Sequence, residues 1–165
     1  MNGPCGRGYG SVSWDMSQRV RAQQATRSDV RFCLVFEREK LSVPAMRQVL
    51  GDILRRLGVN DDSVADILLA ASEACANVVL HAGQSVSAYE VVATVSAAGC
   101  RVEVTDDEVF SPGPAAVADL AESGRGFAVM RACVDGVWLR SEPGQRTSVV
   151  LDKRIRWEPT VPVLA

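Results

Sequence analysis

Glu73 and Asn77 stand one helical turn apart in a segment in which most other side chains are apolar. If such a segment is a helix, it must be substantially buried, and an ionised carboxylate is rarely buried without a partner. Either the two side chains hydrogen-bond neighbouring backbone, or they face a cleft that holds a ligand. Carboxylate and amide oxygens suit Mg²⁺ that shares phosphate oxygens. We therefore interpret this pair as the magnesium–phosphate corner of a nucleotide site.

Two further motifs follow along the chain. Asp106 comes directly after a β-rich segment, where a carboxylate can emerge at a sheet edge and accept a hydrogen bond from an exocyclic amine. Gly124-Arg125-Gly126 leads into an apolar segment, and two glycines that open a helix let backbone N–H groups approach a phosphate. The simpler alternative for Asp106 is a solvated turn after the strand, and for the glycine motif it is a flexible loop before the helix. No Lys-Ser/Thr follows the glycines, so the motif is not a Walker A loop.

Hydrophobic periodicity predicts the elements that must position these residues. We expect a strand at 30–36, helices at 42–57 and 60–82, strands at 89–96 and 101–105, a helix at 127–134, and strands at 136–141 and 147–152. Ser42 is the expected N-cap of the first helix and Gly58 its stop, and Asn60 caps the second. This order predicts an α+β fold, a two-layer α/β sandwich with a mixed, mostly antiparallel sheet and helices on one face.

The bulk composition fits one globular domain. The chain has 165 residues, of which 47% are hydrophobic and 23% charged. We expect a domain at 30–153 between a flexible N-terminal tail, 1–29, and an exposed C-terminal tail, 154–165. The net charge of −2 gives no case for direct nucleic-acid binding or for binding to an anionic membrane.

The expected compartment follows from what the sequence lacks. No apolar run approaches the roughly 20 residues that span a bilayer, and the N-terminus has no apolar signal-peptide core. The five cysteines are odd in number and form no CxxC pair, which argues against a disulfide framework or a zinc site. A reduced, cytoplasmic setting is the simplest expectation.

In this order the motifs resemble those of the histidine-kinase-like ATPases, which have the Bergerat nucleotide-binding fold, over about residues 30–153. The strongest stretch, 69–82 (LAASEACANVVLHA), is similar to the N box of the bacterial regulatory branch of that family. Asp106 matches the adenine-binding aspartate, and 124–130 (GRGFAVM) matches the glycine box of the phosphate lid. Thr147 falls where the family places a threonine near the adenine end. One departure is that Asp106 is followed by Asp-Glu-Val-Phe, whereas the family continues Asp-x-Gly-x-Gly.

The short single-domain form resembles the anti-sigma factor serine kinases of Gram-positive bacteria, which regulate transcription in stress response or sporulation. This resemblance implies a homodimer that binds ATP and Mg²⁺, sequesters a sigma factor, and phosphorylates a serine on an anti-sigma-factor antagonist. It further implies that Glu73 orients or deprotonates the attacking hydroxyl, that Asn77 is the Mg²⁺ ligand, and that Asp106 reads the adenine amino group. The nucleotide-binding residues that it implies are Asn77, Asp106, Gly124, Arg125, Gly126 and Thr147.

Two other functions remain open at the level of sequence. The first is a non-catalytic partner-switching protein of the same fold, which the missing glycines after Asp106 favour. The second is a fragment of a sensor histidine kinase. We rank it last, because no dimerisation helix with a phospho-accepting histidine precedes the domain.

Overall fold

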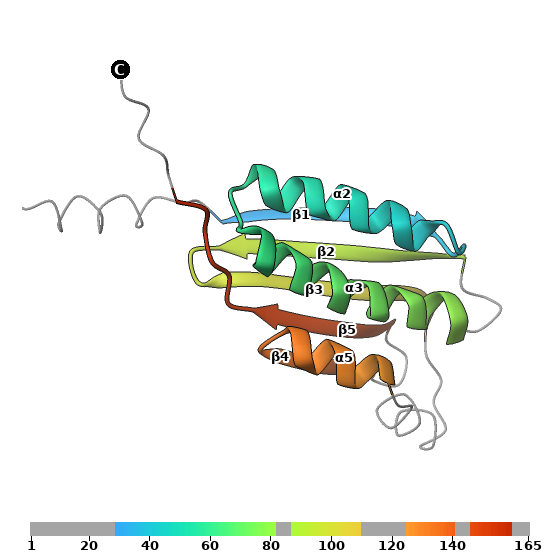
Figure 1. The fold of residues 1–165 in the computed structure, drawn as a ribbon. Helices are drawn as coiled ribbons and strands as arrows, with labels where there is room; N and C mark the ends of the chain where they lie inside the picture. Colours follow the sequence, from blue (N-terminus) through green and yellow to red (C-terminus); the bar gives the residue numbers. More distant parts are fainter. Residues whose placement is uncertain (1–28, 82–86, 110–124, 141–145, 160–165) are drawn as a thin grey trace, which may run out of the picture.

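The computed structural model describes residues 29–81, 87–109, 125–140 and 146–159 of the chain (Figure 1). Within these residues the elements follow the order that the sequence predicts. They are β1 (Val30–Glu37), α2 (Ser42–Arg56), α3 (Asp61–His81), β2 (Ala88–Ser96), β3 (Gly99–Val109), α5 (Arg125–Cys133), β4 (Gly136–Arg140) and β5 (Arg146–Lys153). The predicted N-terminal tail lies outside the described residues apart from Asp29.

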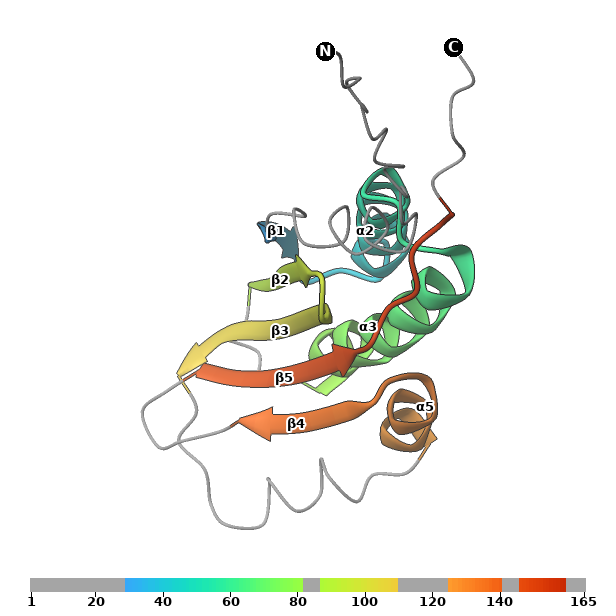
Figure 2. The ribbon, with the colours of Figure 1, turned by 90° about the vertical axis from the view of Figure 1, so that its left-hand side faces the viewer.

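The five strands form one sheet in the order β1-β2-β3-β5-β4. The helices lie together on one face of this sheet, with α3 between α2 and α5 (Figures 1 and 2). The predicted two-layer α+β sandwich is therefore confirmed. In one detail the sheet differs from the prediction: every pairing among the described strands is antiparallel, so this part of the sheet is not mixed.

The core lies between the helices and the sheet. Every second residue of β2 is buried, as expected for a strand with one face against helices. The largest fully buried side chains come from α2, α3, the turn between them, β2, β3, α5 and β5: Met46, Leu50, Leu54, Val59, Val64, Ile67, Tyr89, Val91, Val102, Val104, Met130 and Val150.

The central helix α3 is both long and largely apolar. Residues Asp61–Leu80 are long and apolar enough to cross a membrane by length and composition alone, which corrects the expectation that no segment approaches such a span. Half of this window is buried inside the protein, against the sheet and between two helices. A core helix buried on several sides needs this composition, so the burial accounts for it.

The two helix ends between α2 and α3 agree with the sequence, and the start of α2 does not. Gly58 has φ 84°, the left-handed conformation that ends a helix, and the Asn60 side chain accepts a hydrogen bond from Ser63 N at 3.0 Å. Ser42, however, is the first residue of α2 and not its N-cap; the N-cap is Leu41, without a side-chain cap. The Ser42 hydroxyl bonds instead to Glu39 O and to Tyr89, because the residue is buried against the sheet.

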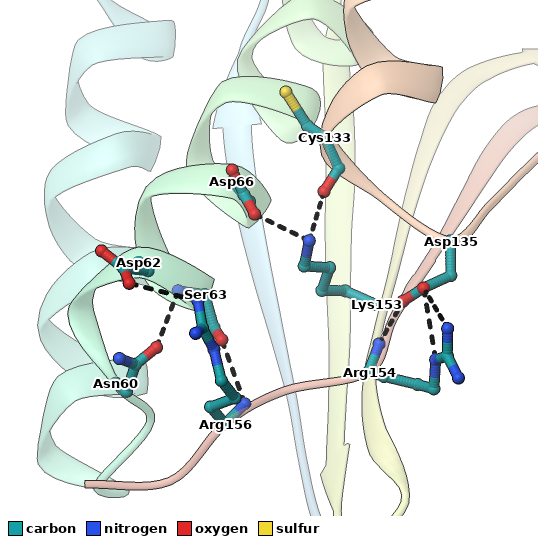
Figure 3. Close-up of polar contacts among 9 residues, drawn as sticks. All are labelled: Asn60, Asp62, Ser63, Asp66, Cys133, Asp135, Lys153, Arg154 and Arg156. Carbon is teal, nitrogen blue, oxygen red and sulfur yellow. Dashed lines mark hydrogen bonds and ion pairs between the residues drawn. The ribbon is translucent and has the colours of Figure 1, made fainter.

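The chain after β5 is not the exposed tail that the sequence suggests, at least as far as residue 159. Val59 and Trp157 form an isolated antiparallel bridge, and Trp157 is partly buried against the core. Arg156 N donates to Ser63 Oγ at 3.0 Å (Figure 3). Asn60 N donates in turn to Arg156 O at 2.9 Å. This segment therefore closes the end of the helical layer where α2 turns into α3.

Lys153, the last residue of β5, joins three elements. Its ammonium group donates to Asp66 Oδ2 of α3 at 2.7 Å. It also donates, at 2.6 Å, to the carbonyl oxygen of Cys133, which is the last residue of α5 (Figure 3). A cation at a helix C-terminus is favoured by the helix dipole. Lys153 thereby fixes where α5 lies along α3.

We expect Lys153→Met to lower the free energy of unfolding by about 1–3 kcal/mol, because the partly buried Asp66 carboxylate and the Cys133 carbonyl both lose a charged donor. Urea denaturation measures the change. The matched control is Arg55→Met, which removes an exposed ion pair with Asp61 and should change stability by less than about 1 kcal/mol. Equal losses in the two variants would contradict the bridging role of Lys153.

Candidate functional site

The helix α3 carries Glu73 and Asn77 on its side toward α5. Cys75, which lies between them in sequence, is fully buried and faces the core, whereas Glu73 and Asn77 are both half-buried. The four-residue spacing places the two polar side chains one above the other on the helix surface. The helix therefore buries its apolar side in the core and presents a carboxylate and an amide beside its neighbour α5.

Gly126, the second residue of α5, lies directly against these two side chains. A Cβ atom built on Gly126 would stand 3.1 Å from Glu73 Oε2, 3.7 Å from Asn77 Oδ1 and 3.9 Å from Asn77 Nδ2. The first of these distances is closer than most real Cβ contacts. The structure thus brings together three of the residues that the sequence singled out, from segments about 50 residues apart.

The first turn of α5 has the properties of an anion site. The first N–H groups of a helix have no partner within the helix, and the helix dipole places partial positive charge there. Arg125, the first residue of α5, is exposed and adds a full positive charge. Gly124 lies outside the described residues, so its part in the predicted phosphate lid stays a prediction.

Asp106 lies inside β3 and not after it, which corrects the predicted strand end at residue 105. It pairs directly with Tyr89 of β2. Opposed residues of antiparallel strands point to the same face, and Tyr89 is fully buried under the helices. The Asp106 side chain therefore points into the helix-covered face, and its Oδ1 atom is buried.

Thr147 lies on β5 beside Asp106. The pairs Thr105–Ser148 and Val109–Arg146 flank a shift in register, so three residues of β3 oppose Thr147 alone. Such a bulge bends a strand and re-aims its side chains, and bulges are frequent next to functional sites. Thr147 alternates with Val149 and Leu151, which pair with Val104 and Val102 of the helix-covered face. Asp106 and Thr147 thus lie on adjacent strands, under α3.

The oxygen atoms of Glu73 and Asn77 suit a magnesium ion that is also bound by ligand phosphates better than a metal ion bound by protein side chains alone. Among the described residues, no group of three or more His, Cys, Asp or Glu could hold a metal ion. Glu73 and Asn77 instead offer two hard oxygen donors beside the anion-favouring turn of α5, at the point where Gly126 approaches them. Mg²⁺ keeps several waters and usually takes one or two protein oxygens together with substrate phosphates.

The described residues also line a cavity at the opposite end of the sheet. It measures about 580 Å³ and includes Thr94, Arg101 and Arg154 in its wall. Its charged side chains bind one another: Arg101 makes a two-bond ion pair with Asp152, and Arg154 binds Asp135. None of the residues that the sequence singled out for chemistry lines it, so we assign the candidate site to the α3–α5 corner.

The comparisons with known proteins give the family of this chain. Residues 36–153 match the histidine kinase-like ATPase domain, and the chain therefore belongs to that family. An anti-sigma F factor of Clostridium acetobutylicum is 26% identical over 102 residues, which cover 56% of this chain and 71% of the relative. An anti-sigma F factor of Clostridium botulinum is 25% identical over 66% of this chain and 82% of the relative. The predicted resemblance to this branch of the family is thereby confirmed.

A solved structure of the RsbU and RsbW domains from Mycobacterium tuberculosis has the same fold. It superimposes with a TM-score of 0.61 and 21% sequence identity over 80% of this chain. The match spans only about a third of that structure, 34% of its length. The α3–α5 corner therefore lies in a domain of the histidine kinase-like ATPase family.

We expect Gly126→Ala to weaken nucleotide binding at least about tenfold while the free energy of unfolding stays within about 1 kcal/mol of the wild type. The added methyl group would push against Glu73 Oε2 where the ligand must approach. Gly51→Ala is the matched control: it lies in α2, and its Cβ would be as crowded, at 3.0 Å from Arg55 Nη1 and Leu68 Cδ1, but it approaches neither Glu73 nor Asn77. Calorimetric titration with nucleotide measures both variants; equal affinities would contradict the placement of the site.

Proposed function

We propose that this chain is an ATP- and Mg²⁺-binding anti-sigma factor that sequesters a sigma factor and phosphorylates a serine on an antagonist protein. The observation that carries the proposal is the approach of Gly126 to Glu73 and Asn77. This approach places a helix N-terminus, a carboxylate and an amide at one point in a domain of the histidine kinase-like ATPase family. The names of the anti-sigma F factor relatives support the choice of partner.

At this corner each residue has a distinct task. Asn77 supplies the protein oxygen that holds Mg²⁺, and the first turn of α5 with Arg125 offsets phosphate charge. Bound ATP-Mg²⁺ supplies the phosphoryl group and neutralises the charge that develops on it. Glu73 orients the serine hydroxyl and takes its proton. The serine oxygen bonds to the γ-phosphorus of ATP while the bond from that phosphorus to the bridging oxygen breaks, and ADP leaves. Phosphoryl transfer is mostly positioning and charge stabilisation, so a small domain with few functional side chains suffices.

The strands supply the end of the site that holds the base. Asp106, with its side chain on the helix-covered face, accepts a hydrogen bond from the adenine amino group. Thr147, across the bulge from it, contributes a hydroxyl to the same end. Gly124 and Gly126 let the backbone approach the phosphates. These roles follow the family resemblance, and the register of β2, β3 and β5 supports them.

The partner proteins define the rest of the function. We propose a cytoplasmic homodimer that binds a sigma factor and, in competition with it, a serine-bearing antagonist, with no direct contact to nucleic acid or membrane. Edge strands and α2 are the surfaces that we propose for these contacts. In the described sheet the edges are β1 and β4.

A second candidate function is a partner-switching protein that binds without catalysis. The observation that favours it is the length of β3, which continues as a strand through Val109 where the family resemblance would place a glycine-rich turn. A strand brings its backbone less close to a nucleotide than a glycine turn does. Nucleotide affinity and phosphoryl transfer therefore need separate tests.

We expect Asn77→Ala to abolish the Mg²⁺-dependent part of ATP binding, because the variant removes the protein ligand of the ion. A thermal shift with ATP and Mg²⁺ measures this: at 100 times the dissociation constant, the wild type gains about 2.7 kcal/mol of stability, and the variant should gain much less. Gln48→Ala, which removes an exposed amide from α2, is the control and should respond as the wild type does. No shift in the wild type at millimolar ATP would exclude the nucleotide hypothesis.

We expect Glu73→Gln to keep ATP binding but to slow serine phosphorylation at least about 100-fold, because an amide cannot accept the hydroxyl proton. The measurement is transfer of radiolabelled phosphate from ATP to antagonist proteins that co-purify with the chain from its native host. Recovery of a sigma factor in the same preparation supports the anti-sigma role. ATP binding by the wild type without any transfer would instead establish the partner-switching alternative.

A further inference from the structure

Tyr89 is a buried residue that the proposed function does not use, and it lies beside the site. It is the second residue of β2, it is 0% exposed, and its Cα partners are Asp106 on β3 and Phe36 on β1. Directly opposed side chains in antiparallel strands have Cβ atoms about 4.5–5.5 Å apart on the same face. The phenol ring therefore rises from the sheet into the helical layer next to the Asp106 carboxylate.

The Tyr89 hydroxyl group is part of a buried chain of hydrogen bonds. Ser42 Oγ donates to Glu39 O at 2.6 Å, which uses its single proton. The contact of 2.8 Å between Ser42 Oγ and Tyr89 Oη is therefore donated by Tyr89. Tyr89 also hydrogen-bonds with Cys75 of α3. One phenol thus binds the start of α2 and the middle of the site helix.

These groups stay neutral over the physiological range. Burial raises the pKa of Tyr89 to about 12, and burial also raises the pKa of the Cys75 thiol to about 12. Each group therefore keeps its proton and can act as a donor. A chain of neutral, mutually satisfied groups in a low-dielectric core is rigid, since leaving any member without a partner is costly.

The two ends of the proposed site meet through this residue. Cys75 lies between Glu73 and Asn77 on α3, and Tyr89 lies opposite Asp106 on the strand pair. Tyr89 thus connects the helix that holds the magnesium corner, through the hydrogen bond of its side chain to Cys75, with the strand position of the base-reading carboxylate, through its pairing with Asp106. Phe36 lies opposite Tyr89 on the neighbouring strand β1, and the centroids of the two rings are 5.7 Å apart, so Phe36 packs against the Tyr89 ring.

We propose that Tyr89 is a positioning residue that sets the place of Asp106 relative to the Glu73–Asn77 corner and thereby selects nucleotides that carry an adenine amino group. This inference rests on the proposed nucleotide binding, and it adds a determinant of base specificity that does not itself touch the nucleotide. It follows that loss of the Tyr89 hydroxyl weakens recognition of the base more than recognition of the phosphates.

The test is Tyr89→Phe, which keeps the ring and its packing and removes only the hydroxyl. Calorimetric titration compares ATP with purine riboside triphosphate, which lacks the 6-amino group, both with Mg²⁺. We expect the wild type to prefer ATP, and the variant to bind ATP about tenfold more weakly while its affinity for the analogue changes about twofold or less. The preference for ATP should therefore collapse.

A matched control separates positioning from general stability. Val95→Ala truncates a buried side chain on the same strand and the same face, but at the end that pairs with Cys100, away from Asp106. It should lower the melting temperature and leave the preference for ATP unchanged. If Tyr89→Phe does not fold, Ser42→Ala removes the acceptor of the same hydrogen bond and should shift the preference in the same direction by a smaller factor.

The possible outcomes separate this inference from the function on which it rests. An unchanged preference in Tyr89→Phe, with ATP binding intact, overturns the positioning role alone. A wild type that binds both triphosphates equally overturns the role of Asp106 and this inference with it, while nucleotide binding stands. A wild type that binds neither triphosphate overturns the proposed function as well.

Discussion

The first turn of α5 approaches the polar side of α3 so closely that a side chain at residue 126 would crowd Glu73. At 3.1 Å from a carboxylate oxygen, even a methyl group on residue 126 would force a shift. This close packing turns two separate motifs into one site, because it sets a carboxylate and an amide against the end of a helix that attracts anions. The chain belongs to the histidine kinase-like ATPase family, and the phosphates of a nucleotide are the anion that this geometry would suit in such a domain.

The rest of the domain keeps this approach in place. At the far end of α5, the ammonium group of Lys153 ties the last helical carbonyl to Asp66 of α3. Along the helix, Met130 is fully buried, and Cys133 at its last position is nearly so, which fixes the rotation of α5 about its axis. The helix is thus held at three points along nine residues, and its first turn has little freedom to move away from Glu73.

The parts of this site that depend on neighbouring residues in the sequence could be predicted, whereas the parts that depend on pairing between distant strands could not. The spacing of four between Glu73 and Asn77 follows from helical periodicity, and the glycines before residue 127 predict a helix start. The place of Asp106 could not be read in the same way. Whether a strand ends at 105 or continues depends on its neighbours, and β3 continues because β2 and β5 both pair with it beyond that point.

Tyr89 and residues 154–159 were missed for the same reason. No sequence motif announces that a tyrosine will stand opposite a given aspartate, because register is decided by the whole sheet. The apolar residues Ile155 and Trp157 were the signal in the sequence that the chain after β5 would pack against the domain. Burying large apolar side chains removes their surface from water, which is favourable. Ser42 likewise looked like a cap, and its burial beside the sheet gave its hydroxyl another partner.

The apolar character of α3 has a consequence for how the protein is made. The helix is complete at His81, but the strands that cover it and the lysine that secures α5 to it follow over the next 70 or so residues, ending at Lys153. At about 5–20 residues per second, a ribosome takes several seconds to produce them. During that interval the nascent chain carries its most apolar segment without its final partners. Chaperone demand during synthesis should therefore be set by α3, and a chain cut short before β5 would be prone to aggregate.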